Sequence, residues 1–557
     1  MNSPLLIAQY TFPVARTANG NAISQTIIAG NYLFTIEGNN GLMAFKIMSG
    51  PPAAPTFTQQ PQNLRVIQGG TGTLTVLPDQ VVNSYQWTRN GTNLATATTL
   101  SYTINNAQLT DAASYRCVIS NAYGMATSTV AVVTVTATND ICRLSPIWSA
   151  SPTNGPAYVT STGGASMPQE RYIAFNSLSN QLLVVQRDTV NIPTTYTVWV
   201  VDGATGTTLH KLRTDVTIFN NVVSEVNGSS GLGLDAIAVA DDGAVYACNL
   251  SPNASGGATN GYDPAKLFRV YRWANTDSNT VPTQIFSGDP ANQNTVNVRW
   301  GDAFNVRGSG LNTEIILDSR LGDFAAILKP TDSSMVAFTN FWWNSHVGSG
   351  ELGRSLEFAG PSACWQKRKG IGVKYSAYDT NANASVVLAD YYNFPSTLGG
   401  VTMDLTRKIA VGVDFVGTAG STPDAVGLYD ITDINAPWLI SRYSFPATKT
   451  SNANFFGNTL IAGNRVFSLD GNNGIVAFNI LTPKSAVTIS HIVSNPNGTV
   501  TINYAGGGGS AFVLVKSSAI NVAKDAWIPV LTNSTSPGTF TAPMTDPGKL
   551  FYSIQSK

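Results

Sequence analysis

The sequence predicts an all-β, multidomain protein whose largest part is a β-propeller of about seven blades, accompanied by two small β-sandwiches. Three observations predict this class. Hydrophobic stretches alternate apolar and polar residues with a period of two, and Gly, Asn and Asp turns separate them, which is typical of antiparallel strands. No long helical pattern interrupts these stretches. The chain has 557 residues, which is too many for one ordinary domain.

The composition excludes several classes of protein. Charged residues make up 11% of the chain, and 32 basic residues balance 32 acidic ones. A nucleic-acid-binding protein would show a basic excess or patch, and neither is visible. Hydrophobic residues at 43% can fill cores, so global disorder is excluded. No apolar run approaches the roughly 18–20 residues that a membrane span requires. We therefore expect neither a nucleic-acid partner nor a membrane span.

The low lysine content and the abundant Thr, Asn and Gly are typical of a secreted surface protein, which predicts an extracellular or cell-surface location. No standard signal peptide is visible, because the first basic residue is Arg16 and the apolar stretch Pro4–Ala8 is too short. Either a leader has been removed or the chain is a piece of something longer. The four cysteines are far apart and form no CxxC pair, which argues against a zinc ribbon or a thioredoxin-like site.

The first element is a repeat. Residues 2–47 align without a gap with residues 435–480, and 23 of 46 positions are identical. The shared part predicts a hairpin, because its GNNG turn permits the positive φ that tight hairpins need. Residues 1–48 thus form a blade-like segment. The residues that we expect to matter for assembly lie in the two hairpins: Tyr32, Phe34, Ile36, Asn39, Asn40, Gly41 and Phe45 in the first, and Phe467, Asn472, Asn473 and Phe478 in the second.

A Pro/Gly linker at 49–54 leads to the second element, residues 55–136. The stretch YQWTRNG contains Trp87, and LTDAASYRC contains Asp111, Tyr115 and Cys117. On these residues the segment resembles a bacterial immunoglobulin-like domain of the I-set type. The resemblance implies that Trp87 packs at the centre of a sandwich and that Tyr115 forms a corner. Val76 stands where the partner cysteine is expected, so Cys117 should be a buried free thiol.

The third and largest element is the block 143–481. Its strands and tight polar turns divide into about seven blades at roughly 45–50 residues per blade. The phrases RYIAFNSLSNQLLVV, VADDGAVYACNL, FRVYRWA, RWGDAFNVRGSGLNTEI and VFSLDGNNGIVAF resemble an uncharacterised propeller-like family of large secreted planctomycete- and verrucomicrobia-type bacterial proteins. That resemblance implies a fold and a habitat, but no activity. The last element, 482–557, has short alternating strands that predict a small fibronectin-like sandwich, and it resembles C-terminal modules of the same bacterial proteins.

Two polar stretches are candidate ligand sites. His346 lies beside Trp342 and Trp343 in FWWNSHVGS, which is either a stacking site on a propeller face or a buried aromatic cluster between blades. Arg299, Trp300 and Asp302 begin the stretch RWGD. An Arg–Asp pair there either faces the central channel, where it could hold a carboxylate or a sugar, or joins two blades as an ion pair.

Catalytic and metal motifs are missing. The chain has no nucleophile elbow, P-loop or HExxH motif, and its three histidines are scattered, so we expect no enzyme. Asp379, Asn381 and Asn383 have the odd-position oxygens of a calcium loop. However, Ala384 stands where that loop needs Gly, and the distal Glu is absent. A plain polar turn is the simpler interpretation, and no cofactor is expected.

Two functions follow from the repeat. In the first, the chain is an extracellular structural protein that polymerises head to tail, because its N-terminal hairpin completes the unfinished propeller of a neighbouring copy. In the alternative, residues 1–48 are the tail of a preceding propeller in a longer tandem protein. The chain would then be a cell-surface adhesin or a glycan-binding module, with a glycan or a surface protein as its partner.

Overall fold

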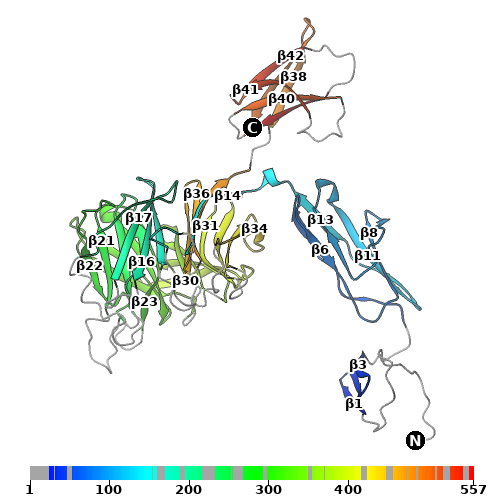
Figure 1. Cartoon of the computed structure of the whole chain (residues 1–557), viewed down its shortest axis with the longest axis horizontal. Coiled ribbons are helices and arrows are strands. Elements are labelled where there is room, and N and C mark those ends of the chain that lie inside the picture. Colours follow the sequence, from blue (N-terminus) through cyan, green and yellow to red (C-terminus); the bar gives the residue numbers. More distant parts are fainter. Residues whose placement is uncertain are drawn as a thin grey trace. The chain divides into compact units, whose positions relative to one another are not determined.

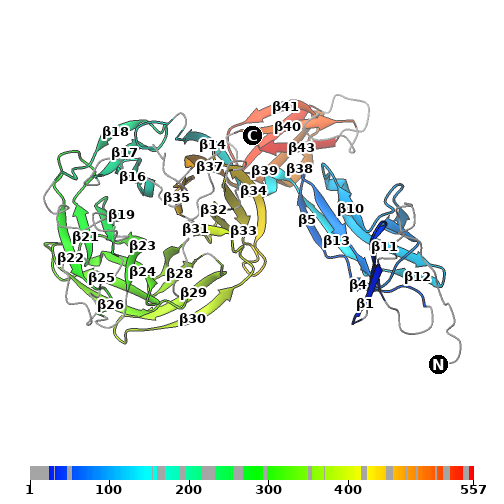
Figure 2. The same ribbon diagram turned by 60° about the horizontal axis from the view of Figure 1, so that its bottom comes forward.

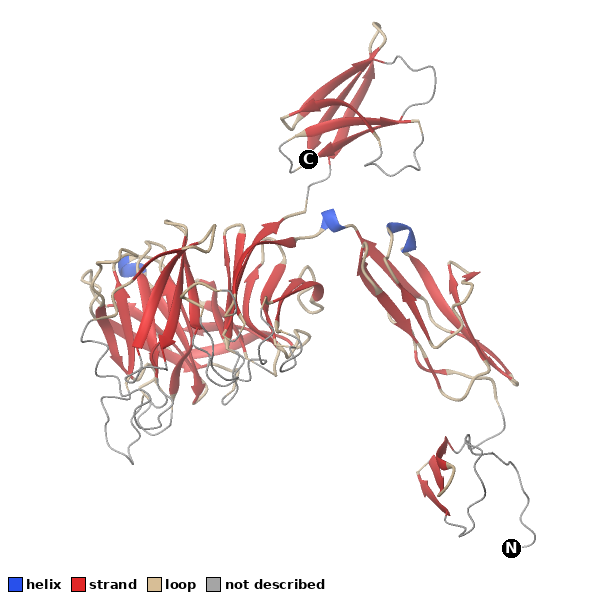
Figure 3. Cartoon of the chain, viewed as in Figure 1, coloured by secondary structure: helices blue, strands red, loops and turns tan. Residues whose placement is uncertain are grey.

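A computed structural model of the chain is all-β (Figure 1), with short 3₁₀ helices at Leu109–Asp111, Thr138–Asp140 and Gly310–Asn312 among the described residues (Figure 3). The described residues are 24–30, 32–46, 53–152, 155–159, 170–188, 195–215, 232–251, 254, 267–292, 298–348, 354–368, 370–415, 423–446, 456–471, 473–483, 487–507, 511–518, 527–543 and 551–556. The chain divides into two compact units, Met1–Thr136 and Ala137–Lys557.

Within the described residues, the first unit contains the predicted hairpin together with one further strand, and the three strands make an antiparallel sheet. Its strands are β1 (Ser24–Ala29), β2 (Tyr32–Glu37) and β3 (Gly41–Lys46). The turn between β2 and β3 is the predicted GNNG turn, and Gly41 has a φ of 96°. Strand β1 was not predicted, because its sequence SQTIIA shows no clear alternation of apolar and polar residues.

The rest of the first unit is the sandwich expected from Trp87 and Tyr115. The strands are β4 (Phe57–Gln59), β5 (Leu64–Ile67), β6 (Gly72–Thr75), β7 (Leu77–Pro78), β8 (Ser84–Arg89), β9 (Thr92–Asn93), β10 (Ser101–Ile104), β11 (Ala113–Asn121), β12 (Gly124–Thr127) and β13 (Ala131–Thr136). Trp87 is fully buried, and the Tyr115 hydroxyl donates to the Asp111 carbonyl at 3.0 Å. Cys117 is a buried free thiol, as predicted, and Val76 is buried in the same core.

The described residues of the second unit build six four-stranded antiparallel sheets. Their strands, sheet by sheet, are β15 (Glu170–Asn176), β16 (Gln181–Asp188), β17 (Thr195–Asp202) and β18 (Thr208–Lys211); β19 (Leu232–Val239), β20 (Val245–Leu250), β21 (Phe268–Trp273) and β22 (Thr283–Gly288); β23 (Arg299–Arg307), β24 (Glu314–Leu321), β25 (Phe324–Pro330) and β26 (Phe338–Asn344); β27 (Ser355–Gly360), β28 (Ala363–Lys367), β29 (Val373–Asp379) and β30 (Ala384–Tyr391); β31 (Leu398–Asp404), β32 (Ile409–Asp414), β33 (Ala425–Asp430) and β34 (Trp438–Ser444); and β35 (Gly457–Ala462), β36 (Arg465–Asp470) and β37 (Gly474–Leu481) with β14 (Arg143–Ala150).

These sheets follow one another around a closed ring (Figure 2), an arrangement compatible with a β-propeller. The first strands of consecutive sheets lie side by side in the cyclic order β15, β19, β23, β27, β31, β35 and back to β15. The described residues build six such sheets, against the estimate of about seven blades. The block of 339 residues supplies about 56 residues for each of the six described sheets, which is more than the 45–50 residues per blade that the estimate assumed.

The ring closes through strand β14, which comes from the start of the block. It pairs antiparallel with β37 from the end of the block, so that Leu144 lies opposite Ile480 and Ala150 opposite Ile475. Buried ion pairs also join neighbouring sheets. Arg171 on β15 contacts Asp235 on β19 at 2.6 Å, and Arg354 contacts Asp318 on β24 at 2.7 Å. The β14–β37 pairing thus joins the two ends of the block and closes the ring.

The C-terminal strands form two three-stranded sheets. One contains β38 (Val487–Ser494), β39 (Thr499–Gly506) and β42 (Gly538–Pro543), and the other contains β40 (Phe512–Ser517), β41 (Ile528–Asn533) and β43 (Phe551–Ser556). Buried side chains of both sheets, including Ile502, Phe540 and Leu514, share one core, which makes a small β-sandwich. Among the residues described, no helix is long and apolar enough to cross a membrane.

Candidate functional site

The repeat in the sequence is also a repeat in the structure. Adding 433 to the bounds of β1, β2 and β3 gives residues 457–462, 465–470 and 474–479, which are β35, β36 and the first six residues of β37. The internal contacts correspond as well. The hydroxyls of Thr26 and Thr35 lie 2.9 Å apart, and those of Thr459 and Ser468 lie 2.8 Å apart. The N-terminal sheet is therefore a copy of the ring sheet that closes against β14.

The two copies differ in what covers them. Phe467, Leu469 and Ile475 in the ring are fully buried. Their N-terminal counterparts are exposed: Phe34 by 38%, Ile36 by 45% and Leu42 by 65%. In the ring, Phe467 stacks on Phe175 of the next sheet, with ring centroids 5.0 Å apart. An exposed apolar surface of this kind marks a surface that another molecule or segment covers.

The edges of the two copies differ in the same way. Strand β37 pairs with β36 on one side and with β14 on the other. Within the described part of the chain, β3 has β2 as its one neighbouring strand. No described strand therefore pairs with the outer edge of β3, and an edge strand of this kind can template pairing with another strand.

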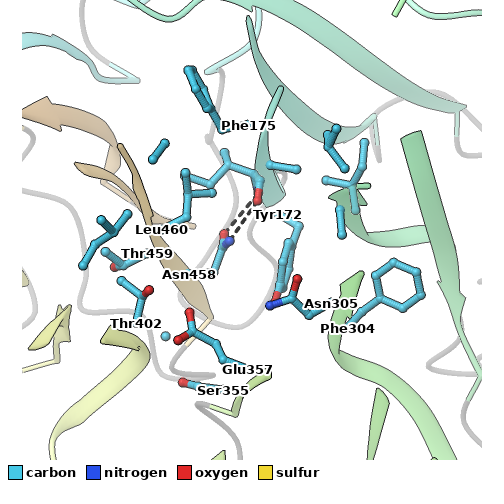
Figure 4. Close-up of a pocket in the computed structure, with 18 of the residues that line it drawn as sticks. Tyr172, Phe175, Phe304, Asn305, Ser355, Glu357, Thr402, Asn458, Thr459 and Leu460 are labelled. Atoms are coloured by element: carbon cyan, nitrogen blue, oxygen red, sulfur yellow. Dashed lines mark hydrogen bonds between the residues drawn. The ribbon is translucent and has the colours of Figure 1, made fainter. Parts of the chain in front are cut away.

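Asn458 and Arg465, which hydrogen-bond the neighbouring sheet through Ile173 and Asn180, are not repeated in the N-terminal copy, and neither is Gly457. The side-chain amide of Asn458 clasps Ile173 on β15, donating to its carbonyl at 2.9 Å and accepting from its N–H at 3.1 Å (Figure 4). The counterparts of Gly457, Asn458 and Arg465 are Ser24, Gln25 and Tyr32. The N-terminal copy thus retains the hydrogen bonds within the sheet but lacks Asn458 and Arg465, which bond to the neighbouring sheet.

The remaining residues expected to act in assembly lie in or near the two turns. Asn40 donates its backbone N–H to the Glu37 carbonyl at 3.1 Å, and Asn473 makes the equivalent bond to Asp470 at 3.1 Å. Asn39 also donates its N–H to the Glu37 carboxylate at 3.2 Å. Phe45 on β3 is half-buried, whereas its counterpart Phe478 on β37 is buried against Tyr443. Asn472 lies outside the described residues.

The predicted aromatic site lies mainly within the core. Trp343 on β26 is fully buried and stacks on Tyr378 with centroids 4.5 Å apart. Trp342 is half-buried and packs edge-on against Phe324. His346 hydrogen-bonds the Ser385 hydroxyl at 2.8 Å. The arrangement is that of an aromatic cluster between sheets, with Trp342 as its more accessible member.

The predicted Arg–Asp pair closes within strand β23. Two guanidinium nitrogens of Arg299 donate to the two carboxylate oxygens of Asp302, each at 2.8 Å. Trp300 is fully buried and donates its indole N–H to Asp289 at 3.1 Å. The two side chains thus neutralise each other's charge. None of the three residues lines the cavity at the centre of the ring that is described below.

The calcium-like stretch forms a turn. The Asp379 carboxylate accepts the backbone N–H of Asn381 at 2.8 Å and that of Ala382 at 3.3 Å, and Asn383 has a φ of 48°. In the described ranges, no group of three or more His, Cys, Asp or Glu side chains could hold a metal ion.

The structure adds a site that sequence reasoning missed: a cavity of about 400 Å³ in the middle of the ring (Figure 4). All six first strands, β15, β19, β23, β27, β31 and β35, contribute to its lining. Two charged side chains are among the lining residues, Arg354 and Glu357. The available signal was the lone carboxylate in SLEFAG, a strand that is otherwise uncharged.

Glu357 links two neighbouring sheets. Its carboxylate accepts the Met403 N–H of β31 at 3.3 Å and a hydrogen bond from the Thr402 hydroxyl. Ser355, two residues earlier on β27, accepts the Val401 N–H at 2.7 Å. Desolvation by the surrounding strands raises the pKa of Glu357 to about 7, although the two hydrogen bonds oppose this shift.

The raised pKa of Glu357 predicts how stability depends on pH. The folded ring holds this proton more tightly than the unfolded chain, so the contribution is fully present below pH 4.5 and is lost as the pH rises to about 7. Glu357→Gln removes the titration but keeps an oxygen that can accept the Met403 N–H. We expect the melting temperature of the native chain, relative to that of the variant, to fall between pH 4.5 and 7. A difference that stays constant over this range would contradict the prediction.

Comparisons with known proteins support the sandwich of the first unit. A family model described as an immunoglobulin domain matches residues 54–121. No curated protein matches the chain. Similar solved structures include the N-terminal Ig1-2 module of a Drosophila receptor protein tyrosine phosphatase (22% identity, 19% of this chain and 61% of that chain, TM-score 0.14) and the Pseudomonas aeruginosa periplasmic gluconolactonase PpgL (11% identity, 69% and 87%, TM-score 0.31). Because immunoglobulin-like domains are typical of surface and extracellular proteins, the family match indicates a cell-surface or adhesion-type module. The resemblance to large secreted bacterial proteins stays a prediction.

Proposed function

We propose that the chain is an extracellular structural protein that associates with further copies of itself through the N-terminal sheet β1–β3, without a catalytic step. The observation that supports self-association most directly is the exposure of Phe34, Ile36 and Leu42, whose counterparts in the ring are fully buried. The same chain already contains the surfaces that cover this sheet pattern, namely β14 and the sheet that begins with β15. A second copy of the chain is therefore the occupant that best fits β1–β3.

The described ring sets a condition on this association. Each of its six sheets has four strands, so a donated sheet enters a neighbour's ring only in place of β35–β37. The resident sheet β35–β37 is held by the hydrogen bonds between Asn458 and Ile173. The donated sheet has Gln25 in place of Asn458. Association is then an exchange that must first open the ring, and it should be slow and concentration-dependent. Repeated at both ends of each chain, it gives an open head-to-tail assembly.

The test uses a donor made more like the resident sheet. Ser24→Gly with Gln25→Asn restores the two residues that β35 uses in the ring, and Phe34→Glu places a charge at the position of buried Phe467. We expect sedimentation and electron microscopy to show more and longer assemblies for the double variant than for the native chain. For Phe34→Glu we expect association weakened about a hundredfold or more, because a charge would enter an apolar core.

Two controls distinguish sheet exchange from non-specific hydrophobic association. Val81→Glu changes a residue that is 90% exposed in the sandwich and should leave association unchanged. Deletion of residues 1–48 should abolish it. Monodisperse particles for the native chain and the double variant at all concentrations would overturn the proposal, and so would equal effects of Phe34→Glu and Val81→Glu. A surface module without self-association, binding a glycan or another surface protein, would then be the better account.

A further inference from the structure

The central cavity contains one carboxylate, that of Glu357, for which the described lining offers no positively charged partner. Arg354 and Glu357 are the charged side chains that line it. The Arg354 guanidinium contacts the Asp318 carboxylate at 2.7 Å, with both side chains fully buried, so this positive charge is already compensated. No described basic side chain lies within ion-pair distance of Glu357. Above the Glu357 pKa of about 7, the lining therefore carries a net negative charge at this residue.

The groups around Glu357 are neutral oxygens and rings. The Thr402 hydroxyl and the Met403 N–H reach its carboxylate. The Tyr172 hydroxyl is uncharged, because burial raises its pKa, and the nearby Glu357 charge raises that pKa further. Ser355, Thr402 and Glu357 lie near one another, with Tyr172 and Asn305 beside them (Figure 4). A carboxylate offers about four acceptor sites, so these two donors leave acceptor capacity for a ligand.

We propose that the central cavity binds a small organic cation, whose ammonium group pairs with the Glu357 carboxylate. A volume of about 400 Å³ lies in the range of small-molecule sites. A cation supplies the counter-charge that the described lining lacks, and Tyr172 adds an aromatic ring of the kind that favours cations. The proposed cation contacts come from β15, β27 and β31 and not from β35–β37, the sheet that self-association would exchange, so the two proposals can be tested separately.

Other ligand classes fit this lining less well. A divalent metal ion needs several oxygen ligands, whereas Glu357 is the one uncompensated carboxylate in the described lining, and no described cluster of three or more metal-ligating side chains exists. A neutral sugar could be bound by hydroxyls and amides alone. It would gain no advantage from a carboxylate rather than an amide at position 357, and this difference makes the two classes separable.

The test compares charged and uncharged probes on the full chain and on Glu357→Gln. Ethanolamine and choline are titrated by saturation-transfer NMR at a pH above the Glu357 pKa of about 7, with ethylene glycol as the uncharged counterpart of ethanolamine. We expect saturable binding of both amines to the native chain and a loss of about tenfold or more in affinity for Glu357→Gln. The glycol should bind far more weakly than ethanolamine, and Glu357→Gln should not alter its binding.

Three results would overturn the inference. These are equal affinity of the amines for both proteins, no saturable binding of either amine, and glycol binding as tight as that of ethanolamine. Circular dichroism and thermal melting of Glu357→Gln establish that a lost affinity does not reflect a lost fold. Asp215→Asn, which removes an exposed carboxylate outside the cavity, is the matched charge control and should leave amine binding unchanged.

Discussion

Replacing Gly474 by alanine is expected to destabilise the ring by about 2–5 kcal/mol, the sum of backbone strain and overpacking. Gly474 has a φ of 100°, a conformation that side chains disfavour. A Cβ there would lie 2.1 Å from the Ala150 carbonyl oxygen on β14. Because that atom belongs to the backbone, it can move away only if β14 separates from β37. The substitution therefore acts on the strand pairing that closes the ring.

Gly463→Ala is the matched control in the same sheet. Gly463 also has a positive φ, of 59°, but a Cβ added to it would meet no atom within 4 Å. It should cost only the strain, about 1–2 kcal/mol. Urea unfolding monitored by tryptophan fluorescence measures both variants. Equal losses for Gly463→Ala and Gly474→Ala would mean that contact with β14 contributes little to the ring.

Removing the carboxylate of Asp318 is the second change with a large expected effect. Asp318→Ala leaves the Arg354 guanidinium buried without its partner, which costs about 3–5 kcal/mol. Arg354 also donates to the Gly348 carbonyl at 2.7 Å, so it cannot leave for solvent without breaking a second contact. Equilibrium unfolding in urea measures the loss.

Two variants test that explanation. Asp215→Ala removes one partner of the exposed Arg213–Asp215 pair and should have no measurable effect. Asp318→Leu combined with Arg354→Met replaces both charges by apolar groups and should recover most of the stability, since no buried charge remains unpaired. If the double replacement is as unstable as Asp318→Ala, lost packing rather than the unpaired charge causes the damage.

The immunoglobulin-like core was predictable residue by residue. Trp87, Tyr115 and Cys117 stand at spacings that two adjacent strands impose, and the valine at position 76 was enough to predict a free thiol. The repeat was predictable because the identity between residues 2–47 and 435–480 needs no structural knowledge. Its third strand, β1, was missed, since SQTIIA becomes a strand through pairing with β2 rather than through its own pattern.

The all-β class, the immunoglobulin-like sandwich and the duplicated sheet were therefore predictable from the sequence, because alternation, turn residues and internal identity can be read directly along a chain. Only the folded structure shows that the described strands make six sheets in a ring, that β14 closes this ring against β37, and that Glu357 faces a cavity lined by the first strand of each sheet. These features depend on pairing and packing between segments hundreds of residues apart. Such contacts leave no periodic signal in the segments that make them, so they emerge only when the chain is folded.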